Sequence, residues 1–123
     1  MASGANLEYF RAEIPQESPN EIHLEWRMVS DTAVNEFHVF RKMSHDSEFV
    51  KLGDVGRLAS YVNPRIYTYV DRNVFKSPAS SEPVQYELRA VTQGGVVTLG
   101  RTEINYTSTG VRRTWGSIKS MFQ

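Results

Sequence analysis

Two stretches of this chain alternate between apolar and polar residues, and this alternation restricts the fold more than any other feature. The first stretch has an apolar side chain at every second position from Ile22 to Met28, and the second does so from Val84 to Ala90. A period of two places every second side chain on the same face of a β-strand. Each stretch is therefore predicted to be a strand with one face in a core and the other in solvent.

Short β-prone runs and turn signals fill most of the remaining sequence up to residue 107. Gly94 and Gly95 indicate a hairpin, Gly100 indicates a bulge in the last strand, and residues 53–66 are expected to be a longer connection without strand character. We expect about seven strands and no helix before residue 110: residues 7–14, 22–28, 37–42, 49–52, 67–70, 84–90 and 96–106. Sequential short strands with short connections indicate an antiparallel sandwich of two sheets.

Several of these segments resemble strands of fibronectin type III domains. Residues 22–26 (IHLEW) are similar to the second strand of that family, whose tryptophan fills the core between the sheets. Similar matches are found at residues 37–39 for the third strand, 67–74 for the fifth, 85–92 for the sixth and 103–106 for the last. The sequences of residues 49–53 and 69–71 resemble those of bacterial members of the fibronectin type III family. The resemblance covers about residues 7–107 and implies an all-β, seven-stranded antiparallel sandwich with Trp26 buried between the sheets.

One position departs from the family pattern. Most members place a corner tyrosine where this chain has Val84, and Tyr86 follows two residues later. The resemblance therefore implies that the phenolic hydroxyl that bonds back to the preceding loop is missing. We expect the loop at residues 75–83 to be fixed in another way.

Composition narrows the classes of function. The chain has 123 residues, which is the length of one domain, and it has no cysteine, so disulfides and thiolate zinc sites are excluded. The net charge of zero argues against nucleic acid as a partner. No apolar run approaches the ~20 residues that span a bilayer, and residues 1–6 lack the features of a signal peptide. The sequence leaves the cellular compartment open.

Catalytic and metal-binding patterns are weak. His23 and His38 fall at outward positions of neighbouring strands, so they are expected to face each other, with Glu25 and Glu36 nearby. Without further ligands at a suitable spacing, solvent-facing histidines are favoured over a metal pair. Residues 44–46 (Ser-His-Asp) are typical of a turn, because a catalytic triad needs groups that converge from separate elements. We expect no catalytic residue, no metal and no cofactor.

The aromatic residues divide into two groups. Strand phase places one group in the core: Trp26, Phe37, Tyr69, Tyr86 and Tyr106. The other group is assigned to exposed positions, where local packing is favoured over protein contact or sugar stacking: Phe40, Tyr61, Tyr67 and Phe75.

Residues 110–123 differ from the sandwich expected at residues 1–109, because their apolar residues follow a helical period. At 100° per residue Val111, Trp115, Ile118 and Phe122 fall within an arc of about 60°, and the charges in this tail are Arg112, Arg113 and Lys119. So short a helix needs a partner surface in water. Residues 1–36 carry seven acids and two arginines, a balance of −5, which complements the +3 of the tail.

The sequence thus predicts a non-catalytic protein-binding or assembly module with a short C-terminal amphipathic helix. The predicted partner-binding residues are Val111, Arg112, Arg113, Trp115, Ile118, Lys119 and Phe122. The tail is expected to pack on its own sandwich, on a second copy or another protein, or, less favoured with three positive charges, on a membrane surface. The alternative function is an accessory, carbohydrate-contacting domain of a larger enzyme or surface protein.

Overall fold

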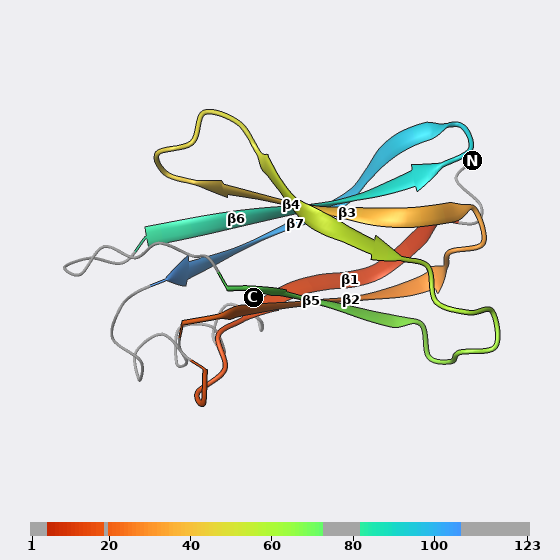
Figure 1. Cartoon of the computed structure of the whole chain (residues 1–123), viewed down its shortest axis with the longest axis horizontal. Helices are drawn as coiled ribbons and strands as arrows, with labels where there is room; N and C mark the ends of the chain where they lie inside the picture. The colour runs from red at the N-terminus through yellow and green to blue at the C-terminus, as the bar shows by residue number, and fades with distance from the viewer. Residues whose placement is uncertain (1–4, 19, 73–81, 107–123) are drawn as a thin grey trace.

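The computed structural model describes residues 5–18, 20–72 and 82–106, which form seven β-strands (Figure 1). In chain order the strands are β1 (Asn6–Glu13), β2 (Ile22–Ser30), β3 (Val34–Met43), β4 (Val50–Gly56), β5 (Ile66–Asp71), β6 (Glu82–Thr92) and β7 (Gly95–Tyr106). A three-stranded sheet of order β1-β2-β5 packs on a four-stranded sheet of order β4-β3-β6-β7, and every pairing is antiparallel. The predicted all-β antiparallel sandwich is confirmed, whereas the predicted helix at residues 110–123 lies outside the described residues.

The two alternating stretches form the middle of the core. From Ile22 to Met28 in β2, and from Val84 to Ala90 in β6, every second side chain points between the sheets and is at most 2% exposed. β2 is the central strand of the small sheet, and β6 is an inner strand of the large one. Period-two patterning therefore predicts both the strands and the face that each one buries.

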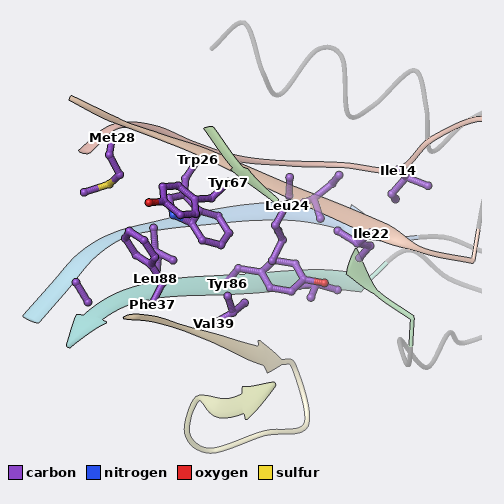
Figure 2. Packing of buried hydrophobic residues seen from close by; sticks show 14 of the residues in the cluster. Ile14, Ile22, Leu24, Trp26, Met28, Phe37, Val39, Tyr67, Tyr86 and Leu88 are labelled. Atoms are coloured by element: carbon purple, nitrogen blue, oxygen red, sulfur yellow. The ribbon is translucent and has the colours of Figure 1, made fainter. Parts of the chain in front are cut away.

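Trp26 stands at the centre of an aromatic cluster that joins the sheets. Its ring stacks on Tyr67 of β5 at a centroid separation of 5.7 Å and meets the edge of Phe37 of β3 at 5.5 Å. Figure 2 shows these three rings packed together between the layers. The expectation that Tyr67 is exposed is wrong: residues two apart share a face, so Tyr67 points inward with Tyr69. Its side chain is 2% exposed.

β4 extends further than expected. Residues 53–66 were predicted to be a connection, but the strand continues through Asp54 to Gly56. A bulge lies opposite Val39 and Phe40, and the register shifts there. An extra residue breaks the alternation and hides the strand from a periodicity search.

Gly53 is required where the two sheets approach each other closely. It faces inward opposite Val39, and a Cβ at this position would lie 2.9 Å from the Tyr69 hydroxyl oxygen. The absence of a side chain admits the Tyr69 ring, whose hydroxyl donates a hydrogen bond to the Leu52 carbonyl oxygen at 3.1 Å.

The hairpin and bulge glycines are found as predicted. Gly95 begins β7 with a φ of 130°, a conformation that favours glycine. The β6–β7 register shifts next to Leu88, which pairs with Gly100. A Cβ on Gly100 would lie 2.9 Å from the Leu7 side chain, so this glycine lets β7 approach β1.

A buried carboxylate joins the sheets at the end of the sandwich where β5 ends. Asp71, 3% exposed, accepts a 2.7 Å hydrogen bond from the Tyr86 hydroxyl and two 2.9 Å bonds from Arg41 Nη1. The resemblance implies that no tyrosine hydroxyl bonds back to the loop at residues 75–83, most of which lies outside the described residues. The Tyr86 hydroxyl, two residues after Val84, bonds to the last residue of β5.

A second buried carboxylate fixes the opposite end. Asp31, in the β2–β3 turn, is 4% exposed and accepts hydrogen bonds from Arg65 and from the Tyr67 hydroxyl. Arg65 also donates to the carbonyl oxygens of three residues of the β4–β5 loop: Leu58, Ala59 and Val62. The Tyr67 oxygen accepts the Leu58 N–H at 3.0 Å. Burial and the bond to Asp31 raise the pKa of Tyr67.

Replacing Trp26 with alanine should reduce the free energy of unfolding by about 3–5 kcal/mol, as for other large core aromatics. Chemical denaturation measures the change. The matched control is Val29→Ala on the same strand, where the side chain is 67% exposed and the expected change is within about 0.5 kcal/mol. A Trp26 variant as stable as this control would contradict the core assignment.

Replacing Asp71 with alanine should lower the free energy of unfolding by about 3–5 kcal/mol, because it leaves the largely buried Arg41 charge, whose side chain is 14% exposed, without this carboxylate. The same denaturation measurement applies. Glu8→Ala serves as the control: it removes an ion pair to Arg27 whose side chains are 49% and 42% exposed, and it should cost less than about 1 kcal/mol. Equal losses in the two variants would show that Asp71 does not join the sheets.

Candidate functional site

The outward face of the four-stranded sheet carries two adjacent rows of polar and aromatic side chains. On the two middle strands the inward neighbours of these residues are buried, namely Phe37 and Val39 on β3 and Leu88 and Ala90 on β6. The polar and aromatic side chains therefore form the second face of the sheet. One cross-strand row contains Asp54, His38, Arg89 and Thr98, and the next contains Lys51, Phe40, Glu87 and Arg101. We call these eight residues the outer face.

Glu87 lies at the centre of the outer face and is only 2% exposed. It accepts hydrogen bonds from Arg89 at 3.1 Å, from Thr98 at 3.0 Å and from Arg101 at 3.4 Å. Burial by itself raises the pKa of Glu87, but the bonds from Arg89 and Thr98 and the nearby positive charges outweigh it. The pKa consequently lies below the ordinary value of 4.5.

Two cations cover aromatic rings beside Glu87. The Arg89 guanidinium lies 3.8 Å from the centre of the Phe40 ring, and the Arg101 guanidinium lies 5.3 Å from the centre of the Phe49 ring. A cation over an aromatic ring is attracted by the ring's negative face, which holds each arginine close to the sheet. Phe40, predicted to be exposed, is half-buried beneath Arg89. Arginine and aromatic side chains are enriched in protein interfaces.

A histidine and two carboxylates converge at one edge of the outer face. His38 Nε2 lies 2.7 Å from Glu36 Oε2 on the same strand and 3.4 Å from Asp54 Oδ1 on β4. Lys51 Nζ contacts the same Asp54 oxygen at 2.8 Å. The hydrogen bond from Lys51 keeps the pKa of the Asp54 carboxyl below its ordinary value.

The expected meeting of His23 with His38 does not occur, because β2 and β3 belong to different sheets. His23 instead lies 3.0 Å from Glu21, and Arg72 holds the other oxygen of that carboxylate at 3.1 Å. Glu25 also lies apart from His38, bonded to Arg11 and to the Tyr9 hydroxyl. Asp54 is not recognisable from the sequence as a neighbour of His38, because the bulge in β4 breaks the alternation of the strand. The cross-strand position of residue 54 becomes visible only once β4 is paired with β3.

Residues 44–46 form a turn, as expected. The Asp46 carboxylate accepts the Met43 N–H at 2.9 Å, and the His45 side chain is 63% exposed. The predicted partner-binding residues from Val111 to Phe122 lie outside the described residues, as does Phe75. Tyr61 is 87% exposed, in agreement with the prediction.

An open cavity of about 460 Å³ lies beside Asp31 and includes Arg57 and Arg65 in its lining. Arg65 directs all three guanidinium nitrogens to Asp31 and to loop carbonyls. Arg57 donates to the carbonyls of Asp31 and Thr32. These cations hold the loop in place, so the cavity is a weaker candidate site than the outer face.

Comparison with known proteins identifies the fold. An Fn3-like protein from Clostridium thermocellum is 16% identical, aligns over 87% of this chain and 98% of its own, and has a TM-score of 0.57. A structure of titin kinase and its flanking domains is 14% identical over 80% of this chain, with a TM-score of 0.54, and the match spans 16% of that chain. A myokine structure is 9% identical over 85% of this chain and 97% of its own, with a TM-score of 0.53.

No protein-family model and no curated protein matches the sequence. At these identities the structural likeness establishes the fold alone, and this chain has a fibronectin type III-like fold. Within the described residues, no helix is long and apolar enough to cross a membrane.

Glu87 should make stability depend on acid pH. Its pKa is lower in the folded protein than in the unfolded chain, so its stabilising contribution is complete above the ordinary value of 4.5 and is lost as the pH falls through the folded value. Glu87→Gln should therefore be less stable than wild type at pH 7, with the difference shrinking towards pH 3 in thermal unfolding. Glu103→Gln, an exposed carboxylate on β7, is the control and should follow the wild-type profile.

Proposed function

We propose that this chain is a non-catalytic protein-binding or assembly module in which residues 110–123 are the docking element. The observation that carries the proposal is a basic, aromatic, helix-periodic tail on a sandwich whose core is already closed. The inward side chains of β2 and β6 are at most 2% exposed, and the Trp26 ring packs on rings from β3 and β5. Its large apolar residues, Trp115 and Phe122, are the kind of side chain that anchors interfaces.

The charges of the described residues support a docking surface for the tail. Of the seven acids within residues 1–36, five have a basic partner: Glu8, Glu21, Glu25, Asp31 and Glu36. The other two, Glu13 and Glu17, are exposed and have no basic partner among the described residues. The excess of negative charge in this region is thus concentrated at the end of β1 and in the β1–β2 loop.

The free carboxylates lie at the end of the sandwich where β7 ends. Antiparallel pairing places the end of β1, the β3–β4 loop and the end of β7 together (Figure 1). Glu48, in the β3–β4 loop, is a third exposed carboxylate at this end. These carboxylates are opposite in charge to the basic tail, which favours docking of the tail at this end of a second copy. Because the core of the sandwich is already buried, the sandwich does not need the tail of its own chain to complete it.

The carbohydrate alternative is less well supported. It relied on Tyr61, Tyr67 and Phe75 as exposed stacking residues. Tyr67 is stacked on Trp26 in the core and cannot meet a sugar. Tyr61 alone remains as an exposed aromatic side chain among these three within the described residues.

The intact chain should have a larger mass in sedimentation equilibrium than a chain that ends at Ser108. The double variant Trp115→Ala/Phe122→Ala should lower the mass to that of the shortened chain while leaving the thermal unfolding of the sandwich unchanged. Added salt should weaken the association, because the basic tail and the exposed carboxylates Glu13, Glu17 and Glu48 carry opposite charges. Tyr61→Ala, at the opposite end of the sandwich, is the control and should keep the wild-type mass.

Two results would contradict the proposal. A monomeric intact chain whose double variant loses several kcal/mol of stability would show that the tail is part of the core. An intact chain with the same mass and the same stability as the shortened chain would remove self-association as its role.

A further inference from the structure

We propose that Glu36, His38 and Asp54 form a binding site for a divalent transition-metal ion of the zinc class. The proposal stands apart from the tail and rests on the geometry of β3 and β4. Glu36 and His38 are two residues apart on one strand, so they share a face, and Asp54 is the direct cross-strand partner of His38. Their donor atoms all lie within 4.8 Å of one another.

The donor separations are close to those that a bound ion imposes. Zinc takes nitrogen and oxygen ligands at about 2.0–2.2 Å, which places two ligand atoms of a tetrahedral site about 3.4 Å apart. The distance between His38 Nε2 and Asp54 Oδ1 is already 3.4 Å. The distance from His38 Nε2 to Glu36 Oε2 is 2.7 Å and must lengthen, which the 42% exposed Glu36 side chain permits by rotating.

The ligand types select the metal. Imidazole suits zinc, copper, nickel and iron, whereas magnesium and calcium prefer sites made only of oxygen. Two carboxylates supply the negative charge that a divalent ion requires. Three protein ligands leave at least one coordination position for water or for a side chain from another protein. The site lies on a paired sheet, which holds the three side chains in a fixed register.

Lys51 is the competitor for this site. Its ammonium group contacts the same Asp54 oxygen that faces His38. An incoming ion must displace this cation, so Lys51 weakens binding. Removing the lysine charge should therefore strengthen metal binding, an effect that a purely structural role of the cluster does not predict.

The chain contains its own matched control. Glu21 and His23 have the same two-residue spacing and a similar nitrogen–oxygen distance of 3.0 Å. Their third neighbour is the cation Arg72 in place of a carboxylate. This pair should not hold a divalent ion.

The test is calorimetric titration of the full chain, without an affinity tag, with zinc chloride and separately with magnesium chloride. We expect one equivalent of zinc to bind and magnesium to give no signal. His38→Ala and Asp54→Asn should each weaken zinc binding at least ~10-fold, the lower end of the loss seen when even an indirect partner of a metal ligand is removed. His23→Ala should bind as wild type does, and Lys51→Met should bind more tightly.

The use of two ligand variants separates a lost ligand from a lost fold, since Asp54→Asn changes an exposed side chain. Absence of zinc binding to the wild-type chain would overturn the proposal. So would binding that His23→Ala weakens as much as His38→Ala does, because this result would indicate general histidine binding.

Discussion

The sandwich depends on a carboxylate that is buried between its two sheets. Asp71 belongs to the small sheet, and it accepts hydrogen bonds from Arg41 and Tyr86, which belong to the large one. Apolar contacts press the sheets together without direction, but this ion pair fixes how one sheet lies over the other. A buried charge is tolerated only where its hydrogen bonds are satisfied, so a sliding of the sheets would expose its full desolvation cost.

Asp31 repeats this arrangement at the opposite end, with Arg65 and Tyr67 as its partners. Between the two carboxylates lies the aromatic cluster around Trp26, which supplies the apolar part of the contact. The polar ends specify alignment and the aromatic centre supplies most of the driving force. Both faces outside this core are thereby left free to carry other chemistry, and the outer face of the large sheet does so.

Sequence reasoning recovered the features that depend on period alone. The inward faces of β2 and β6, the β6–β7 hairpin and the bulge at Gly100 follow from local patterns. The predictions are wrong where one extra residue shifts the apolar–polar alternation of a strand, or where two contacting residues are distant in sequence. A bulge hid the second half of β4 and with it Asp54, and the pairing of His38 depends on which strands share a sheet. Asp71 and Tyr86 lie fifteen positions apart in the sequence, and no local sequence pattern predicts the hydrogen bond between them.

The two tyrosines of β5 have a consequence for how the molecule resists aggregation. A sandwich of two open sheets has exposed strand edges, whose free backbone groups can recruit a strand from another molecule. Tyr69 uses its hydroxyl to occupy the Leu52 carbonyl, and Tyr67 occupies the Leu58 N–H. Both backbone groups belong to β4 or to the loop that follows it. The side chains of one sheet thus satisfy two backbone groups in and beside the edge strand of the other, and these two groups are no longer available to a strand from another molecule.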